Sequence, residues 1–148
     1  MNSNEEKDAD YWFSYPPAKK PQLMNPIVLA YIGDAIYEVA IRQYLISQPN
    51  QRPHHLHRQA TQFVSAKAQC KFLGLWMPLL TEEEQDVVRQ GRNAKSGSVP
   101  KNADVLEYRH ATAFECLVGF LYYNKQMDRL QYLIGLAIEQ SQQENPKT

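Results

Sequence analysis

Two long apolar stretches of the chain each carry acidic residues near the middle, and this feature constrains the fold most. The first stretch, residues 27–41, reads IVLAYIGDAIYEVAI, and its only charges are Asp34 and Glu38. The second, residues 111–123, reads ATAFECLVGFLYY, and its only charge is Glu115. A carboxylate among apolar side chains is costly unless it is paired, hydrogen-bonded or bound to a metal ion. We therefore expect two packed helices whose carboxylates face each other.

The rest of the chain also has helical signals, and no segment shows the alternating pattern of a half-buried strand. Helices are predicted over about 25–46, 54–77 (one helix or a pair), 82–93, 103–123 and 127–142. Asn25 and Pro26 are typical of a helix start, and Thr81 and Glu84 have the spacing of a capping box. With 148 residues, of which 43% are hydrophobic, the chain is predicted to form one all-α domain.

The boundaries of this domain follow from composition. Residues 1–24 mix acids, aromatics and prolines without a helical period, so they are predicted to be a flexible or loosely docked arm. The domain itself is predicted over 25–142, with a polar tail at 143–148. Gly33 interrupts the first helix, and so small a residue would let a second helix approach Asp34 closely.

The sequence also predicts the compartment. No apolar run reaches the length of a membrane span, and the N-terminus lacks the basic-then-apolar layout of a signal peptide. Cys70 and Cys116 lie in apolar helical patterns and are predicted to be buried free thiols in a reducing compartment. We expect a cytoplasmic protein of a bacterium or an organelle, with no membrane partner.

The formal net charge is zero, but the basic residues are segregated. Residues 39–81 and residues 87–103 contain no Asp or Glu. The candidate polyanion-binding side chains in these tracts are Arg58, Lys67, Arg89, Arg92, Lys95 and Lys101. Segregated basic tracts are typical of proteins that bind a polyanion. The alternative is that these basic residues only form solvated helix faces, and the charge clusters by themselves slightly favour this alternative over polyanion binding.

Helical spacing builds a candidate site from the two acidic stretches. Asp34 and Glu38 share one helix face, as do Thr112 and Glu115. If the helices cross near Gly33, then Asp34 and Glu115 converge. Oxygen ligands suit Mg²⁺ or Mn²⁺, and Mg²⁺ usually takes one or two protein carboxylates while keeping several waters.

A structural alternative applies to each acid, because an isolated carboxylate in an apolar helix is more often paired than catalytic. Arg42 follows Glu38 by four residues and is its expected partner. Arg109 and His110 are the candidate partners of Glu115.

The segment LAYIGDAIYE, residues 29–38, resembles the signature helix of ribonuclease III domains, in which a Gly-Asp pair lies in an apolar helix. The segment YRHATAFECLVGFLY, residues 108–122, resembles their second catalytic helix. The tract RQGRNAKSGSVPKNADVLEYRHATAFECLVG, residues 89–119, is similar to one subfamily, Mini-ribonuclease III. The resemblance covers about residues 25–140.

The resemblance implies a ribonuclease III-type endonuclease domain that works as a helical homodimer. It implies Mg²⁺-dependent cleavage of both strands of double-stranded RNA, leaving 5′-phosphate and 3′-hydroxyl ends, with Mn²⁺ as a substitute metal. Asp34 matches the signature aspartate and Glu115 the essential glutamate, so both are expected to be catalytic residues and metal ligands. Ala30 and Thr112 stand where larger family members have a Glu and an Asp, which implies a leaner metal shell.

The Mini-ribonuclease III subfamily is associated with maturing the ends of the large-subunit (23S) ribosomal RNA precursor. No segment resembles the double-stranded RNA-binding domain of the larger enzymes, so the basic tracts are expected to supply the phosphate contacts. Recognition would then depend on the shape of A-form RNA, with little sequence selectivity. Glu38, Thr112 and Arg109 are interpreted as residues that support the two acids.

Two other functions are compatible with the residues. One is a non-catalytic double-stranded RNA-binding scaffold with a decayed site, which the retention of both Asp34 and Glu115 argues against. The other is a helical dimerisation module, in which the acids are paired to Arg42 and Arg109 and have no chemistry to perform.

Overall fold

The computed structural model describes residues 11–49, 51–95 and 99–144, and within these ranges every regular element is a helix. In chain order the elements are η1 (Pro21–Leu23), α2 (Pro26–Ser47), α3 (Pro53–Val64), α4 (Ala66–Trp76), η2 (Met77–Leu79), α5 (Glu82–Asn93), α6 (Val105–Tyr123) and α7 (Met127–Glu144). The predicted all-α fold is confirmed. Ser65 separates α3 from α4, because it ends the first helix and its hydroxyl accepts the Ala68 N–H at the start of the second.

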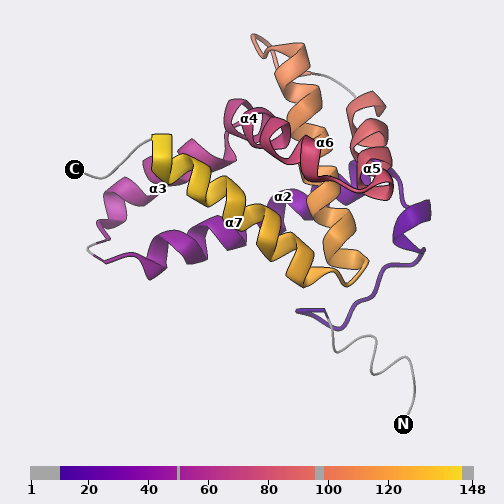
Figure 1. Ribbon diagram of the computed structural model, residues 1–148, viewed down its shortest axis with the longest axis horizontal. Helices are drawn as coiled ribbons and strands as arrows, with labels where there is room; N and C mark the ends of the chain where they lie inside the picture. The colour runs from indigo at the N-terminus through magenta and orange to yellow at the C-terminus, as the bar shows by residue number, and fades with distance from the viewer. Residues whose placement is uncertain (1–10, 50, 96–98, 145–148) are drawn as a thin grey trace.

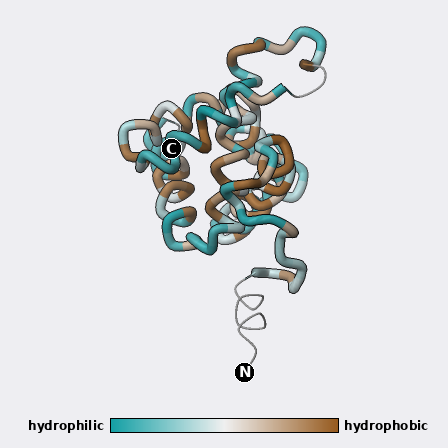
Figure 2. The backbone as a smooth tube through the Cα atoms, turned by 90° about the vertical axis from the view of Figure 1, so that its right-hand side faces the viewer, coloured by the Kyte–Doolittle hydropathy of each residue, from teal (hydrophilic) through white to brown (hydrophobic). Residues whose placement is uncertain are grey.

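Helix α6 forms the centre of the bundle (Figure 1). Its sequence is apolar on nearly every side, and every residue from Ala111 to Tyr122 is buried except Glu115, which is half-buried. Helices α2, α4 and α5 pack directly on it. Figure 2 shows the hydrophobic stretches gathered toward the middle of the molecule, with hydrophilic turns outside. A helix that is apolar all round must be enclosed in this way.

Helices α2 and α6 are in backbone contact where they cross. A Cβ atom added to Gly33 would lie 1.8 Å from the carbonyl oxygen of Glu115, and one added to Gly119 would lie 2.0 Å from that of Leu29. No side chain fits at either position. The two glycines thus set the distance between the helices, and the expectation that Gly33 admits a second helix is confirmed.

The core beside this crossing is aromatic, and its polar atoms are satisfied. The rings of Trp76 and Phe114 stack with centroids 4.4 Å apart, and Tyr37 meets Phe114 edge-on at 4.8 Å. The Tyr37 hydroxyl donates to the Phe63 carbonyl at 3.0 Å, and Trp76 Nε1 donates to the Leu133 carbonyl at 2.8 Å. Buried Tyr and Trp residues are tolerated when their polar ends find such partners.

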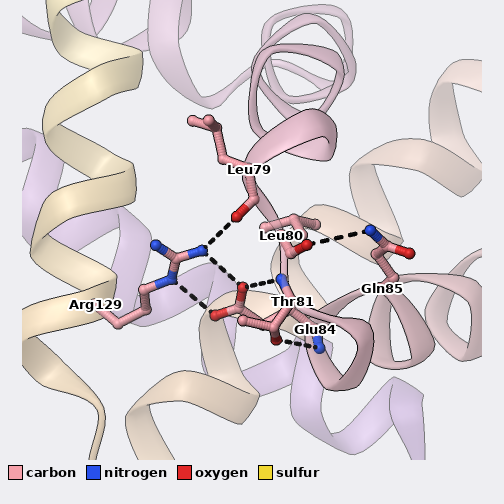
Figure 3. Close-up of polar contacts among 6 residues, drawn as sticks. All are labelled: Leu79, Leu80, Thr81, Glu84, Gln85 and Arg129. Atoms are coloured by element: carbon pink, nitrogen blue, oxygen red, sulfur yellow. Dashed lines mark hydrogen bonds and ion pairs between the residues drawn. The ribbon is translucent and has the colours of Figure 1, made fainter.

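A buried ion pair fixes the start of α5 (Figure 3). The capping box is confirmed, because Glu84 N donates to Thr81 Oγ1 at 3.1 Å and Thr81 N donates to Glu84 Oε1 at 2.9 Å. Glu84 is also only 2% exposed. Arg129 of α7 donates to its two oxygens at 2.9 and 2.8 Å, and donates to the Leu79 carbonyl at 2.8 Å. The ion pair therefore joins α5, α7 and the end of η2.

Replacing Arg129 with Leu should destabilise the protein, because it leaves the Glu84 carboxylate buried without its partner. Breaking a buried pair costs about 3 kcal/mol or more, which lowers the melting temperature by roughly 10 °C for a chain of this size. Thermal unfolding followed by circular dichroism measures the effect. The matched control is Lys71→Leu, which removes the exposed ion pair with Glu144 and should cost less than about 1 kcal/mol.

The same ion pair predicts a pH dependence. Burial by itself would raise the pKa of Glu84, but hydrogen bonds from Arg129 and Thr81 outweigh it and hold that pKa below its usual value. The stabilisation is thus fully present above the unfolded pKa of about 4.3 and is lost as the pH falls through the lower folded value. The stability difference between wild type and Arg129→Leu should shrink below about pH 4, and a constant difference down to acid pH would contradict this assignment.

The described part of the predicted arm, residues 11–24, lies against the C-terminal end of α6 (Figure 1). The Tyr11 hydroxyl donates to the Tyr123 carbonyl at 2.6 Å, and Trp12 N donates to the Tyr122 hydroxyl at 3.1 Å. Residues 1–10 lie outside the described residues.

The structure tests three further expectations, which concern the end of α7, the burial of the two cysteines and the presence of a membrane span. Helix α7 continues two residues past its predicted end, because Glu144 in its last turn pairs with Lys71 and accepts from Gln140; residues 145–148 lie outside the described residues. Cys116 is buried as expected, but the expectation was wrong for Cys70, which is only half-buried on α4. Within the described chain, none of the helices is both long and apolar enough to span a membrane.

Candidate active site

Helices α2 and α6 present their acidic residues to one open depression of about 540 Å³. Its lining residues are Ile27, Ala30, Tyr31, Ile32, Asp34 and Ala35 from α2, with Tyr108, Thr112 and Glu115 from α6. The close crossing at Gly33 produces this arrangement, because Gly33 contacts the backbone of Glu115 and directly precedes Asp34. The two carboxylates that were expected to converge do line one site.

The electrostatics of the site are unfavourable for two bare carboxylates. Asp34 is exposed and Glu115 is half-buried. Burial, a hydrogen bond with Asp34 and then the negative charges of Asp34 and Glu38 raise the pKa of Glu115 to about 9. The protein therefore holds one acid close to another, and no ion pair with a basic side chain of the described residues compensates either charge.

This donor set fits a divalent metal ion such as Mg²⁺. Among the described residues no ion pair joins Asp34 or Glu115 to a basic side chain, and a cation would compensate both charges. Within the described ranges no cluster of three or more His, Cys, Asp or Glu residues could hold a metal. Two carboxylates suffice for Mg²⁺, which keeps several waters and leaves room for substrate phosphate.

Glu38 and Thr112 lie close to the acids but have other partners. Glu38 pairs with Arg42 at 3.4 Å, which agrees with the structural role expected for it, and its charge still contributes to the raised pKa of Glu115. Thr112 lines the depression, and its hydroxyl donates to the Tyr108 carbonyl at 2.9 Å. Thr112 therefore shapes the site without adding a charge.

Arg109 and His110 do not serve as the partners of Glu115. Arg109 is exposed, and among the described residues no ion pair joins it to Glu115. Six residues separate Arg109 from Glu115, a spacing that turns the two side chains to different faces of α6. The Nδ1 atom of His110 is buried without a hydrogen-bond partner. The expectation that these two residues neutralise Glu115 was wrong.

The six candidate RNA-binding side chains lie on three helices and one loop. Arg58 on α3 and Lys67 on α4 are exposed. On α5, Arg92 is half-buried, and Arg89 is exposed but pairs with Asp86. Lys95 and Lys101 are exposed on the loop between α5 and α6, of which residues 96–98 lie outside the described residues.

Two features of the site were not recognised from sequence. Tyr108 lines the depression one helical turn from Thr112, and the spacing of seven residues between Tyr108 and Glu115 was the available signal. Gly119 is the second close contact of the crossing, where it meets the backbone of Leu29. The available signal was a glycine four residues after Glu115 on one apolar helix, together with Gly33 on the other. Neither signal is specific without knowledge of which faces meet.

Comparison with known proteins agrees with this geometry. The family model "Ribonuclease III domain" matches residues 27–126, a range that contains both acidic helices. A crystal structure of a Fusobacterium nucleatum protein has a TM-score of 0.72 and 29% identity, covering 82% of this chain and 98% of that one. The chain belongs to the ribonuclease III family, and the protein is an endoribonuclease.

Several curated relatives of the chain are named Mini-ribonuclease 3. The Mini-ribonuclease 3 of Brevibacillus brevis is 50% identical over 119 residues, which covers 80% of this chain and 89% of the relative. The Mini-ribonuclease 3 of Enterococcus faecalis is 48% identical over 126 residues, which covers 84% of this chain and 96% of the relative. The resemblance to the Mini-ribonuclease III subfamily is therefore confirmed.

Proposed function

We propose that this endoribonuclease requires Mg²⁺, with Mn²⁺ able to replace it, and cleaves both strands of double-stranded RNA in the cytoplasm. We further propose that its substrate is the precursor of the large-subunit (23S) ribosomal RNA, whose 5′ and 3′ ends it matures. The convergence of Asp34 and Glu115 in one depression carries the proposed chemistry. The substrate proposal follows from the resemblance to the Mini-ribonuclease III subfamily.

Each residue of the site has a distinct task in this proposal. Asp34 and Glu115 would hold Mg²⁺, which when bound activates water and stabilises negative charge on the phosphate. Asp34 is exposed and therefore open to an RNA backbone, whereas Glu115 is half-buried and fixed by the helix crossing. Tyr108 and Thr112 form the adjoining wall and keep it free of further charge. Products would carry 5′-phosphate and 3′-hydroxyl ends.

One gel experiment separates the three candidate functions. Long double-stranded RNA is incubated with the protein, with and without Mg²⁺, and then resolved on native and denaturing gels. Cleavage that depends on Mg²⁺ supports the proposal. A mobility shift without cleavage would select the non-catalytic scaffold, and the absence of both would select the dimerisation module. The dimerisation module is already disfavoured, because no ion pair among the described residues joins Arg109 to Glu115.

We also propose a homodimer formed through the exposed face of α2. Ala30 and Tyr37 of this helix are buried within the protomer core, so they do not form the contact themselves. Between them, Tyr31 is 82% exposed, and Val28 one turn earlier is 50% exposed. An apolar face of this kind favours self-association, and a two-fold axis through it would place two acidic sites on one RNA duplex.

Tyr31→Ala should weaken the dimer. Loss of this exposed ring removes apolar area that we expect the two-fold contact to bury, so the variant should dissociate at concentrations at which the wild type is dimeric. Light scattering on a dilution series measures the change. Ile46→Ala is the matched control, because Ile46 is 63% exposed on the same helix but away from the acids. A wild-type monomer at micromolar concentration would contradict the proposed dimer.

The basic residues at the end of α5 and in the loop that follows it supply another test. Arg92 and Lys95 have no ion-pair partner among the described residues, unlike Arg89. Arg92→Ala combined with Lys95→Ala should weaken binding to every double-stranded RNA, and should flatten the dependence of log affinity on log salt by roughly one or two units. Slow cleavage should persist at high enzyme concentration, because the acidic site is intact.

The matched control for the loop is Gln90→Ala, which removes an exposed uncharged side chain from α5. Filter binding across a salt series measures both variants. If the double variant binds and cleaves like the wild type at every salt concentration, then the charges of Arg92 and Lys95 serve only to keep the surface solvated.

A further inference from the structure

The depression that contains the two acids is also lined by three side-chain hydroxyl groups, which belong to Tyr31 of α2 and to Tyr108 and Thr112 of α6. The Thr112 hydroxyl is already engaged, because it donates to the Tyr108 carbonyl at 2.9 Å. The hydroxyls of Tyr31 and Tyr108 have no hydrogen-bond partner within the part of the chain that the structure describes. These two phenol groups are therefore available to hydrogen-bond a substrate in the depression.

Of these two rings, that of Tyr108 is the more restrained. Tyr31 is 82% exposed and belongs to the face of α2 that we propose as the dimer contact, whereas Tyr108 is half-buried on α6. A side chain that is already partly enclosed by its neighbours loses less conformational entropy when it binds a ligand. Tyr108 is therefore better suited than Tyr31 to hold one fixed hydrogen bond to a substrate.

The position of Tyr108 on α6 directs it to a nucleotide next to the cleaved bond. Tyr108, Thr112 and Glu115 are separated by four and then three residues, so they share one face of the helix. The seven residues from Tyr108 to Glu115 span roughly 10 Å along the helix. When a phosphate lies beside the two acids, Tyr108 is therefore too far along α6 for that phosphate and faces the adjoining part of the same RNA backbone.

The charge of the depression favours a ribose over a phosphate as the partner of Tyr108. No Lys or Arg is among the described residues that line the depression, and cationic side chains supply most of the affinity for phosphates. A phenol hydroxyl both donates and accepts a hydrogen bond. The ribose 2′-hydroxyl is likewise a donor and an acceptor, so the two groups are complementary without any charge.

The proposed chemistry gives such a contact a role. Products with 5′-phosphate and 3′-hydroxyl ends form when water attacks phosphorus and the bond to the 3′ oxygen breaks, so the 2′-hydroxyl takes no part in the reaction. DNA contains the same reacting atoms. The enzyme must therefore distinguish RNA from DNA by binding, either through the shape of the duplex or through the 2′-hydroxyl itself.

We propose that the Tyr108 hydroxyl binds the 2′-hydroxyl of a ribose beside the cleaved bond and thereby makes the enzyme selective for RNA. The proposal rests on the function proposed above and adds the residue that recognises the sugar. In this assignment Tyr108 determines specificity: it contacts the substrate but takes no part in breaking the bond. Asp34 and Glu115 keep the tasks described above.

The first test combines two changes, Tyr108→Phe in the protein and a single 2′-deoxynucleotide in the RNA. A set of otherwise identical duplexes carries the deoxynucleotide at successive positions around the cut. At one position, cleavage by the wild type should fall by roughly tenfold, because one hydrogen bond is lost. Tyr108→Phe should cleave the all-RNA duplex with a similar loss, and the deoxynucleotide at that position should cause it no further loss. Independent losses at every position would overturn the proposal.

Two further variants separate this role from a structural one. Tyr132→Phe is the matched control, because it removes a hydroxyl from an exposed residue of α7 outside the depression, and it should cleave every duplex like the wild type. The melting temperature of Tyr108→Phe should equal that of the wild type, because the hydrogen bond from Thr112 uses the backbone carbonyl of Tyr108. If Tyr31→Phe instead of Tyr108→Phe removed the effect of the deoxynucleotide, the assignment to Tyr108 would be wrong.

The second test measures binding in the presence of a chelator, so it does not depend on cleavage. Filter binding compares an all-RNA duplex with the same duplex in which the central nucleotides of one strand are 2′-deoxy. The wild type should bind the all-RNA duplex more tightly, and Tyr108→Phe should narrow this difference. A wild type that shows this difference but cleaves neither duplex in Mg²⁺ would overturn the proposed function and leave the Tyr108 contact standing. An undiminished difference in Tyr108→Phe would overturn the contact.

Discussion

Asp34→Asn and Glu115→Gln should each abolish cleavage of double-stranded RNA while the protein remains folded. Each substitution keeps the shape of the side chain and removes one of the two charges that fit a divalent metal ion. A bound metal contributes several kcal/mol to the stabilisation of a phosphoryl transition state, so we expect a loss of about 10³-fold or more. Gel assays at saturating Mg²⁺ measure this loss.

The control for these variants is Glu139→Gln, which changes an exposed acid on α7 and should cleave RNA normally. Near-wild-type cleavage by either site variant at saturating Mg²⁺ would remove the assignment of the active site. A second readout requires no activity. In the presence of a chelator, Glu115→Gln should melt at a higher temperature than the wild type, because the half-buried acid beside Asp34 is disfavoured when no cation compensates it.

Gly33→Ala should be the most destabilising single change in the helix crossing. The added Cβ would lie 1.8 Å from the Glu115 carbonyl oxygen, and a backbone atom cannot move away by changing rotamer. Alanine gains about 1 kcal/mol of helix propensity over glycine, but separating α2 from α6 loses core packing worth more than about 3 kcal/mol. Chemical denaturation measures the net loss.

Gly135→Ala is the matched control for this prediction. Gly135 also lies in a helix, and no atom lies within 4 Å of an added Cβ there. This variant should therefore be stabilised by roughly 0.5–1 kcal/mol. If Gly33→Ala were as stable as Gly135→Ala, the close crossing of the two acidic helices would be wrong, and the geometry of the site with it.

Features that depend on neighbours along the chain were predictable. The period of the apolar residues indicated the helices, and the spacing of Thr81 and Glu84 predicted the capping box that the structure contains. The candidate site could also be predicted from the sequence, because Asp34 directly follows Gly33 in an apolar helix, and such an acid needs a compensating group. The burial of Glu115 could not be predicted, because it depends on the helices packed around α6.

Features that depend on the meeting of distant residues were missed. Arg129 lies 45 residues from Glu84, and the exposed-looking acids at the start of α5 gave no sign that one of them is buried. Arg109 was a plausible partner for Glu115 by proximity in sequence, but the helix turns it away. The docking of residues 11–24 on Tyr122 and Tyr123 likewise required the C-terminal end of α6 to be in place.

The sequence by itself determined the all-α class, the helix starts and the two acids proposed for the candidate site, because these follow from periodicity, capping and the cost of a carboxylate in an apolar segment. The tertiary structure alone decided which faces of α2 and α6 meet, how far Glu115 is withdrawn from solvent and which rings of the arm remain exposed. These properties arise from packing among residues far apart in the chain, which local patterns do not encode.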